Sequence, residues 1–268
     1  MTAQSRSEIV GLLERHGLAP LHRLGQHFLA DANITRKIVD LAEVGPGSRV
    51  VEVGAGTGTL TRALAAAGAH VVAYEVDRGL RPVLEEVTQG LDVELRFVDV
   101  TDVDFSSALE GSGWSMVANL PYNVGTPVLL EAIRGAMNID PFVVMVQKEV
   151  ALRFAAAPGS EDYGVPSVVT RLYTEVAVEF TVPPQVFYPP PRVESAVVRM
   201  RRRPAPPEAE RAVELARAGF GQRRKMLRRS LASILDKPTE TLEAAGLDPR
   251  LRAEDLTPAD YLRLAEVS

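Results

Sequence analysis

The sequence predicts an α/β protein with a parallel sheet, followed by a small all-helical domain. Between Arg49 and Val146, short apolar runs alternate with helical patterns, which is typical of parallel strands joined by helices. The runs are rich in valine, as expected of strands buried on both faces. After Arg203, a proline-rich linker leads into helical sequence. We therefore predict two domains, residues 1–204 and residues 205–268.

The individual elements follow from hydrophobic period and turn residues. A short amphipathic helix is expected over about residues 8–20, with Pro20 ending it. Strands are expected at Val50–Val53, Val71–Tyr74, Leu95–Val98, Met116–Ala118 and Phe142–Val146, with helices at Thr59–Ala67, at Leu80–Val87 and after Pro127. Two later runs, Glu175–Val182 and Val193–Met200, are expected to form an antiparallel hairpin at one sheet edge. The second domain is expected to contain helices at Arg211–Leu235, near Thr239–Ala245 and at Pro258–Glu266.

Composition narrows the class of protein. Of the 268 residues, 46% are hydrophobic and 24% are charged, an ordinary globular balance. The absence of cysteine excludes disulfides and thiolate metal sites, and no metal site is expected. We see no signal-peptide core and no run of about 18 apolar residues that could cross a bilayer. A soluble cytoplasmic protein without membrane contact is therefore expected.

The net charge of −5 is unevenly distributed. Residues 185–235 contain twelve Lys and Arg against four Asp and Glu, so the rest of the chain is strongly acidic. Such asymmetry is typical of a protein that meets an anionic partner with one face. A solvated arginine-rich helix gives the same pattern, and charge alone does not separate the two interpretations.

A glycine-rich turn follows the first predicted strand. Gly54, Gly56 and Gly58 lead straight into an amphipathic helix, so the backbone can turn sharply and approach a ligand. Nicotinamide, flavin and S-adenosylmethionine sites share such turns, but this spacing is not the one expected for a pyrophosphate. Glu75 ends the second strand, where a carboxylate can bind both ribose hydroxyls, and Asp99 ends the third, where it can bind an adenine amine.

The fourth predicted strand leads into Asn119-Leu120-Pro121-Tyr122. This tetrapeptide suits catalysis on an aromatic amine such as N6, the exocyclic amine of adenine. N6 is a poor nucleophile because its lone pair is delocalised into the ring. The Asn119 side-chain oxygen and the Leu120 carbonyl are suitable acceptors for both N6–H protons, which would direct the lone pair toward an incoming methyl group. Pro121 would fix the direction of that carbonyl, and Tyr122 can stack on a flipped base. Methyl transfer from a sulfonium needs alignment more than a strong base. The alternative interpretation of this motif is an ordinary proline turn after a buried strand, without a catalytic role.

Six motifs together resemble one family. They are Gly25-Gln26-His27-Phe28-Leu29, Val51–Gly58, Asn119–Asn123, Gln147–Val150, Phe187–Ser195 and Gln222–Arg228. In this order they resemble the KsgA family, the 16S ribosomal RNA adenine N6,N6-dimethyltransferases, over about residues 20–265. The resemblance implies a class I (Rossmann-like) methyltransferase domain with a helical C-terminal domain. The implied cofactor is S-adenosyl-L-methionine, and the implied substrate is a pair of adjacent adenines in the 3′-terminal hairpin of the small-subunit rRNA.

The resemblance also implies roles for individual residues. Gln26, His27 and Leu29 would border the cofactor together with Gly54, Gly56, Glu75, Asp99 and Asn119. Phe187 would cover the face of the target base opposite Tyr122. His27 stands where many members have Asn; it could still donate a hydrogen bond to the cofactor carboxylate, in a pH-sensitive way.

Basic residues would bind the RNA backbone. Arg223, Arg224, Lys225, Arg228 and Arg229 are expected within two turns of one helix, with 224, 225 and 228 on one face. Arg201, Arg202 and Arg203 form a second cluster. A monomer is expected, because the basic face and an open cleft must meet a much larger particle.

Two other functions stay open. The related 23S rRNA adenine methyltransferases share the fold and the chemistry, but usually have Ile at the position of Leu120 and lack the Tyr-Asn continuation. A ribosome-assembly factor with secondary or lost methylation is the alternative from another class. A dehydrogenase is disfavoured, because the chain offers no substrate His–Asp pair.

Overall fold

The computed structural model describes residues 3–268, which form two compact units. The sheet unit contains the chain up to Ala151 together with Ala177–Arg201. The helical unit contains Leu152–Val176 and Arg202–Ser268. The chain thus enters the helical unit twice, whereas the sequence predicted a single boundary near residue 205. In residues 3–268, no helix is long and apolar enough to cross a membrane.

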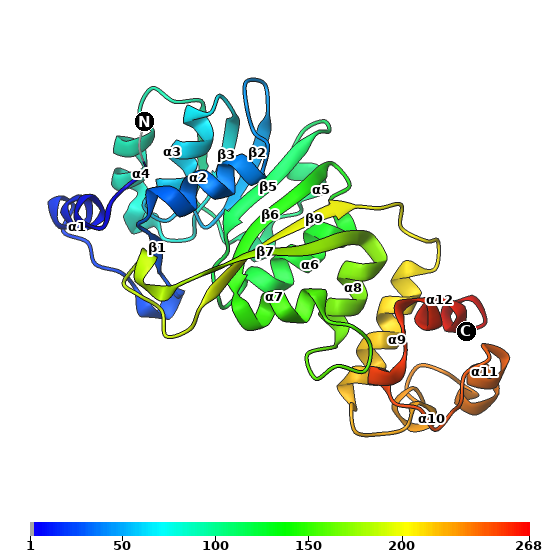
Figure 1. The fold of residues 1–268 in the computed structure, drawn as a ribbon. Coiled ribbons are helices and arrows are strands. Elements are labelled where there is room, and N and C mark those ends of the chain that lie inside the picture. The colour runs from blue at the N-terminus through cyan, green and yellow to red at the C-terminus, as the bar shows by residue number, and fades with distance from the viewer. Residues whose placement is uncertain (1–2) are drawn as a thin grey trace. The chain divides into compact units, whose positions relative to one another are not determined.

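The sheet unit is built on a seven-stranded sheet of order β4-β3-β2-β5-β6-β9-β7 (Figure 1). The strands are β2 (Arg49–Val53), β3 (His70–Tyr74), β4 (Val93–Arg96), β5 (Trp114–Asn119), β6 (Ile139–Gln147), β7 (Thr174–Val182) and β9 (Ser195–Arg202). Strands β2 to β6 pair in parallel, and β9 pairs antiparallel with β6. Strand order reverses at β2, which lies between β3 and β5. In open α/β sheets, ligands bind at the carboxyl ends of strands at such a reversal.

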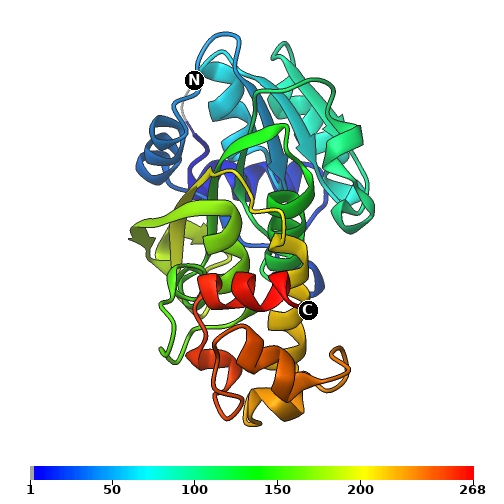
Figure 2. The same ribbon diagram turned by 90° about the vertical axis from the view of Figure 1, so that its right-hand side faces the viewer.

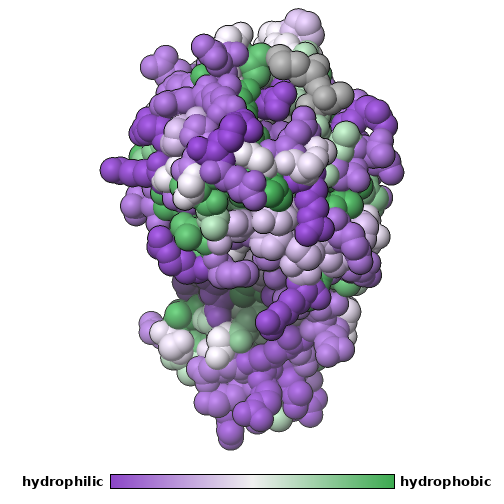
Figure 3. Space-filling model, turned by 90° about the vertical axis from the view of Figure 1, so that its left-hand side faces the viewer, coloured by the Kyte–Doolittle hydropathy of each residue, from purple (hydrophilic) through white to green (hydrophobic). Residues whose placement is uncertain are grey.

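Helices alternate with the parallel strands along the chain, and their apolar sides build the core. They are α2 (Ala32–Leu41), α3 (Thr59–Ala66), α4 (Arg81–Thr88), α5 (Phe105–Ala108), α6 (Gly125–Gly135) and α7 (Lys148–Ala155). Helix α3 lies between α2 and α4 (Figure 1). Ile38, Leu64 and Leu84 from these three helices are buried in one cluster with Val50 and Val71 of the sheet. Hydrophilic side chains predominate on the face in Figure 3, so the apolar surface is directed inward.

The N-terminal helix is shorter than the sequence predicted. Helix α1 runs over Arg6–Arg15, and a capping box between Ser5 and Glu8 starts it. It ends before Gly17, whose φ of +65° is left-handed, and not at Pro20. A 3-10 turn at His22–Leu24 follows. Strand β1 (Phe28–Leu29) then pairs antiparallel with β8 (Phe187–Tyr188).

The helical unit (orange to red in Figure 2, with part of the green segment) contains α8 (Val165–Tyr173), α9 (Ala209–Gly221), α10 (Leu227–Ser230), α11 (Pro238–Ala244) and α12 (Pro258–Glu266). Helix α9 contacts both α8 and α12. Tyr163 and Tyr261 are fully buried in this unit, and each hydroxyl donates to a backbone carbonyl. The predicted helix Arg211–Leu235 is interrupted. Helix α9 stops at Gly221 after two closely spaced glycines, and residues 222–226 turn so that Leu227 N–H reaches the Leu251 carbonyl at 2.7 Å.

Candidate active site

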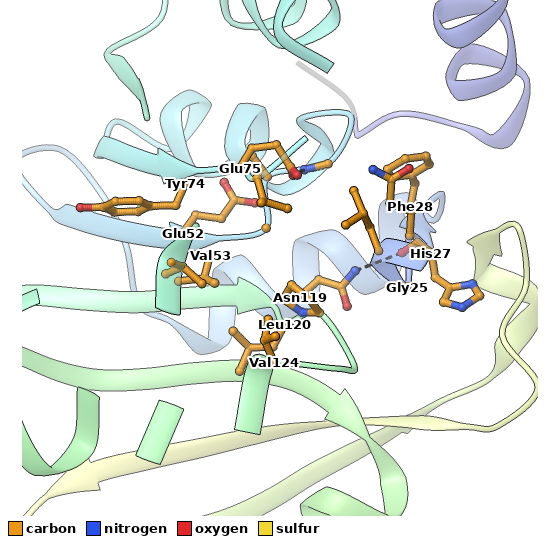
Figure 4. Close-up of a pocket in the computed structure, with 18 of the residues that line it drawn as sticks. Gly25, His27, Phe28, Glu52, Val53, Tyr74, Glu75, Asn119, Leu120 and Val124 are labelled. Carbon is orange, nitrogen blue, oxygen red and sulfur yellow. Dashed lines mark hydrogen bonds between the residues drawn. The ribbon is translucent and has the colours of Figure 1, made fainter. Parts of the chain in front are cut away.

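A cavity opens at the carboxyl ends of β2, β3, β4 and β5, where strand order reverses. Its volume is about 1060 Å³, solvent at the mouth included. The lining includes eleven residues that the sequence predicted for the site: Gln26, His27, Leu29, Gly54, Gly56, Glu75, Asp99, Asn119, Leu120, Pro121 and Tyr122. Residues from β1 and from the ends of β2, β3 and β5 meet at one place (Figure 4), and Asp99 after β4 lines the same cavity.

The turn after β2 requires glycine. Gly54 has φ +79° and Gly56 has φ +59°, in the left-handed region that side chains disfavour. A Cβ atom on Gly56 would lie 2.9 Å from Phe28 Cδ1, and one on Gly54 would lie 3.1 Å from Pro121 Cγ. The glycines therefore bring the backbone against two apolar side chains of the cavity wall, and a ligand can approach this backbone closely.

Glu75 is buried at the end of β3, with 7% of its surface exposed. Its Oε2 accepts the Gly56 N–H at 2.8 Å and its Oε1 accepts the Asp77 N–H at 2.9 Å. Burial raises the pKa of this carboxyl, and the two backbone donors act in the opposite direction. Each oxygen keeps a second acceptor site, which suits a pair of ribose hydroxyls.

Asp99 follows β4 and is exposed at the cavity. Its Oδ1 accepts both the Thr101 N–H at 3.0 Å and the Thr101 hydroxyl at 2.7 Å. These hydrogen bonds hold the pKa of Asp99 below its usual value, so the side chain is ionised at neutral pH. The contacts fix one carboxylate oxygen and leave Oδ2 to accept from a ligand amine.

Two exposed apolar side chains next to these acids were not predicted from the sequence. Val76, after Glu75, is 46% exposed, and Val98, before Asp99, is 43% exposed. Both line the cavity. The sequence placed Val98 in a strand, but β4 ends at Arg96, which leaves this valine in the loop. Together the two valines offer apolar surface for a flat ring.

Glu52 lies inside β2, beneath the glycine turn, and is 1% exposed. Burial raises the pKa of its carboxyl to about 8, nearby Glu75 adds to the shift, and Thr61 acts in the opposite direction. Its Oε2 has no hydrogen-bond partner among residues 3–268. The group is therefore neutral at pH 7.

Asn119 is the last residue of β5, and its side-chain amide hydrogen-bonds within residues 3–268 through the nitrogen only. Its Nδ2 donates to the His27 carbonyl at 3.2 Å, the dashed contact in Figure 4. A carbonyl only accepts, so this contact fixes the orientation of the amide. Asn119 Oδ1 is buried and has no partner within the described part of the chain. Since buried polar atoms are almost always paired, a free acceptor at the cavity wall points to a ligand donor. The adjoining Leu120 is anchored by its N–H, which donates to the Met145 carbonyl at 3.0 Å.

Tyr122 and His27 form the wall beside Asn119. Their ring centroids are 5.4 Å apart, and the Tyr122 hydroxyl is 2.7 Å from Ser195 Oγ. Burial raises the pKa of Tyr122, so the phenol stays neutral. His27 Nδ1 lies 2.8 Å from the Pro189 carbonyl and must carry the hydrogen. A neutral His27 ring therefore presents Nε2 as an acceptor. Donation from Nε2 to a carboxylate, as the sequence analysis expected, requires the protonated ring.

Two predicted site residues have different surroundings from those expected. The Gln26 amide lines the cavity but is engaged within the protein: its Oε1 accepts the Leu21 N–H at 2.8 Å, and its Nε2 donates to Asp77 at 2.8 Å. Phe187 is fully buried in the core and is not part of the cavity lining. It pairs with Leu29 in the β1–β8 ladder, and strand alternation turns its side chain inward. The predicted role of Phe187, covering the face of the target base opposite Tyr122, stays a prediction.

The cavity as a whole fits S-adenosylmethionine. The glycine turn is a cradle that a Cβ would fill, Glu75 offers two oriented acceptors, and the valine pair lies beside the ionised Asp99. The glycine turn suits the amino-acid portion of this ligand, Glu75 suits its ribose, and the two valines with Asp99 suit its adenine.

Comparison with known proteins identifies the family. Residues 21–268 match the family described as ribosomal RNA adenine dimethylase. The chain belongs to this family. A relative from Phenylobacterium zucineum, named ribosomal RNA small subunit methyltransferase A, is 47% identical over 258 residues, 95% of this chain and 90% of the relative. A relative of the same name from Kineococcus radiotolerans is 42% identical, and the match covers 97% of this chain and 90% of that relative. The protein is therefore a methyltransferase that uses S-adenosylmethionine.

Solved structures agree with the fold. A dimethyladenosine transferase from Plasmodium falciparum superposes with a TM-score of 0.75 at 23% identity, covering 89% of this chain and 96% of that one. The 23S rRNA methyltransferase ErmE superposes with a TM-score of 0.66 at 26% identity, covering 90% and 98%. The class I (Rossmann-like) methyltransferase fold predicted from the sequence is confirmed.

The basic residues of this family member are divided by their surroundings. Arg223 donates to Glu254 at 2.7 Å and to the Glu161 carbonyl at 2.9 Å, so it is engaged within the helical unit. Arg224 and Lys225 are exposed and form no ion pair within residues 3–268. They lie in the turn of residues 222–226, not on a helix, so the expected common helix face with Arg228 is wrong. Arg228 and Arg229 are exposed on α10.

The Arg201–Arg203 cluster is divided between the units. Arg201 ends the sheet unit and pairs with Glu43 at 3.2 Å, while Arg202 and Arg203 begin this part of the helical unit. Arg203 pairs with Glu175 at 3.1 Å. Both ion pairs are solvent-exposed, and such pairs contribute little to stability, so either arginine could exchange its partner for a phosphate.

Proposed function

We propose that this enzyme dimethylates the N6 amines of two adjacent adenines in the 3′-terminal hairpin of 16S rRNA, in the small ribosomal subunit or its precursor. The observation that carries the proposal is the unpaired, buried Asn119 Oδ1 beside the cofactor cavity. An exocyclic amine is a donor of the kind this atom lacks. The name shared by the two relatives quoted above favours the small subunit over the 23S rRNA of the ErmE comparison.

Asn119 acts on the nucleophile. Its Oδ1 accepts one N6–H of adenine, and the Leu120 carbonyl, directed by Pro121, accepts the other. Both contacts oppose delocalisation of the N6 lone pair into the ring, so the pair points at the methyl carbon. As the N–C bond forms and the methyl–sulfur bond breaks, the positive charge passes to N6, a neutral thioether leaves, and the hydrogen bonds of N6 strengthen. It then loses a proton to solvent, so no strong general base is needed. A second round, with a second S-adenosylmethionine, uses the one N6–H that remains, which keeps a hydrogen bond to one of the two acceptors. Loss of that proton gives the dimethylated product.

The remaining cavity residues bind and orient. Gly54 and Gly56 receive the amino-acid portion of S-adenosylmethionine, Glu75 its ribose, and Asp99 with the valine pair its adenine. When bound, this cofactor supplies an electrophilic methyl group on a sulfonium. Tyr122 stacks on the flipped target base, a contact worth about 1–3 kcal/mol. Gln26, His27 and Leu29 border the cofactor from β1 and the segment before it, and Phe187 covers the face of the target base opposite Tyr122.

Basic residues supply affinity for the RNA backbone. We assign Arg224, Lys225 and Arg228 to phosphate contacts, with Arg201, Arg202 and Arg203 as a second group and Arg223 as a structural support. Most of these residues belong to the helical unit, so residues 205–268, which the sequence predicted as an RNA-contacting domain, supply the main RNA contacts, and Arg201 adds one from the sheet unit. We expect the enzyme to act as a monomer in the cytoplasm, where the ribosome is assembled.

The assignment of Arg224 and Arg228 to phosphate contacts is tested by changing both residues to glutamate, Arg224→Glu and Arg228→Glu. RNA affinity should fall, and the slope of log K against log salt should become shallower by about one for each lost phosphate contact. Filter binding across a salt series measures both quantities. Lys37→Glu, the same type of charge reversal at an exposed lysine on α2 of the sheet unit, is the control. An unchanged slope would contradict the assignment.

The proposed substrate is tested with labelled S-adenosylmethionine and small subunits that lack the modification, with large subunits in parallel. Nucleosides from the digested RNA are then identified. N6,N6-dimethyladenosine in small-subunit RNA alone is the expected result. Label in the large subunit would assign the protein to the 23S activity. No label in either would favour an assembly role without methylation.

A further inference from the structure

The N-terminal segment contacts the glycine turn through one buried glutamine. Gln4 is 1% exposed, and its amide makes three hydrogen bonds. Its Nε2 donates to the Thr57 carbonyl at 2.8 Å, and its Oε1 accepts the hydroxyls of Thr57 and Thr59, both at 2.8 Å. All three partners belong to residues 57–59, more than fifty positions along the chain.

The partners of Gln4 lie on either side of Gly58, the third left-handed glycine of the glycine turn. Thr57 and Thr59 line the cavity, on either side of Gly58 with φ +81°. Gln4 does not line the cavity, so it acts through the turn and not on a ligand. Left-handed glycines are flexible in the absence of restraints, so a turn with three of them loses much conformational entropy when it is ordered. Hydrogen bonds that hold this turn beforehand reduce the entropy lost on binding.

Gln4 is itself held in place. The residue that follows it, Ser5, is the N-cap of α1, and the capping box with Glu8 fixes the start of that helix. At the other end of α1, Arg15 and His16 contact Glu86 of α4 at 2.6 and 2.7 Å. Ile9 and Leu13 are buried in the core of the sheet unit. The segment from Gln4 to His16 is therefore a fixed strap that crosses from the glycine turn to α4.

We propose that Gln4 is a positioning residue that holds the cofactor turn Gly54–Thr59 ready to receive S-adenosylmethionine, so that the N-terminal strap sets cofactor affinity. The inference rests on the proposed function only in taking S-adenosylmethionine as the ligand of this turn. Glutamine suits the role because one amide both donates to a carbonyl and accepts two hydroxyls. An ionised glutamate could not donate to the Thr57 carbonyl.

Gln4→Met tests the proposal, because it keeps the volume of the side chain and removes its hydrogen bonds. The Kd for S-adenosylmethionine, measured by titration calorimetry on the full chain without RNA, should rise about tenfold. In turnover assays KM for the cofactor should rise, while kcat and KM for RNA stay unchanged. Gln89→Ala, an exposed glutamine beyond α4, is the matched control and should change none of these. Amides of residues 56–60 should also exchange faster with solvent in Gln4→Met.

A second substitution separates positioning from general stability. Thr59→Val removes one partner of Gln4, and in the Gln4→Met background it should weaken binding no further. A full additional loss there would mean that the Thr59 hydroxyl acts on the ligand directly, which overturns the proposal. Unchanged cofactor affinity in Gln4→Met would overturn it as well. If Gln4→Met does not fold, Gln4→Asn, with the amide withdrawn by one methylene, is titrated against the same outcomes. Failure of the unmodified protein to bind the cofactor would instead contradict the proposed function.

Discussion

The two ends of the cavity differ in how their polar atoms are paired before a ligand binds. At the cofactor end, Glu75 accepts two backbone N–H groups and Asp99 accepts two hydrogen bonds from Thr101. At the end of β5, Asn119 donates from its amide nitrogen, but its oxygen has no partner in the described part of the chain. The first arrangement fixes the shape of a binding site. The second leaves one acceptor whose hydrogen bond forms only when a substrate arrives.

This difference separates affinity from chemistry. A buried acceptor without a partner costs about 1–3 kcal/mol, which the folded protein bears until a donor enters. If the N6–H of adenine supplies that donor, the contact is strongest when N6 carries positive charge, so it lowers the barrier more than it tightens ground-state binding. Residues at the cofactor end should accordingly change Kd, and Asn119 should change kcat.

The sharpest test of this contrast is Asn119→Ala. Loss of Oδ1 should lower kcat for methyl transfer about 10³-fold, the scale found when one preorganised group of a transition state is removed. The Kd for S-adenosylmethionine should change by less than about threefold, because the paired groups of the cofactor end remain. Single-turnover kinetics and calorimetry measure the two quantities. Asn33→Ala, an exposed asparagine on α2, is the control. Equal loss of binding and transfer would mean that Asn119 mainly builds the cofactor site.

A substitution at the other end should give the opposite pattern. In Gly56→Ala the new Cβ would lie 2.9 Å from Phe28 Cδ1 in a left-handed backbone. We expect the Kd for the cofactor to rise about 100-fold, since the turn must move and strain of about 1–2 kcal/mol is added. At saturating cofactor, kcat should largely persist.

Gly17→Ala separates strain from collision. Gly17 has φ +65°, but among residues 3–268 no atom lies within 4 Å of the position that a Cβ would occupy. Gly17→Ala should lose about 1–2 kcal/mol of stability from the same backbone strain, as measured by urea denaturation, and should keep its cofactor affinity. Equal weakening of binding in both glycine variants would show that the cavity geometry is not the cause.

The main residues of the site could be predicted because each of them follows a strand. Parallel strands bring their carboxyl ends together, so the sequence alone predicts Gly54, Glu75, Asp99 and Asn119 at one edge of the sheet. Side-chain direction and long-range partners do not follow from this rule. Phe187 is turned inward by the register of a two-residue ladder with β1. Gln4 meets Thr57 across 53 positions of chain without any local pattern.

The interrupted helix after α9 shows the same limit in the helical unit. The sequence from Arg211 onward has a helical pattern, yet the hydrogen bond from Leu227 N–H to the Leu251 carbonyl holds the chain in a turn. Tertiary contacts of this kind override local propensity. Residues Leu152–Val176 joined the same unit for a related reason, since their partners lie far along the chain.

Glu52 is the exception at the cofactor end, because its Oε2 is unpaired like Asn119 Oδ1. It differs in chemistry, since burial raises its pKa to about 8 and the group is a neutral acid at pH 7. An unfolded glutamate ionises near pH 4.5, so between that pH and about 8 the folded state holds one more proton than the unfolded state. The resulting stability is complete at low pH and is lost as pH rises through about 8.

Glu52→Gln removes this proton and should change stability more than activity. The free energy of unfolding of the unmodified protein should fall by about 2 kcal/mol between pH 6 and pH 8 relative to that of the variant, from about 1.4 kcal/mol for each pH unit. Urea denaturation at the two pH values measures the difference. Cofactor affinity at pH 7 should stay within about threefold, because a neutral amide replaces a neutral acid. Parallel pH dependence in both proteins would mean that Glu52 is ionised in the fold. Its unpaired oxygen would then be an acceptor for the cofactor, and the contrast between the two ends of the cavity would no longer hold.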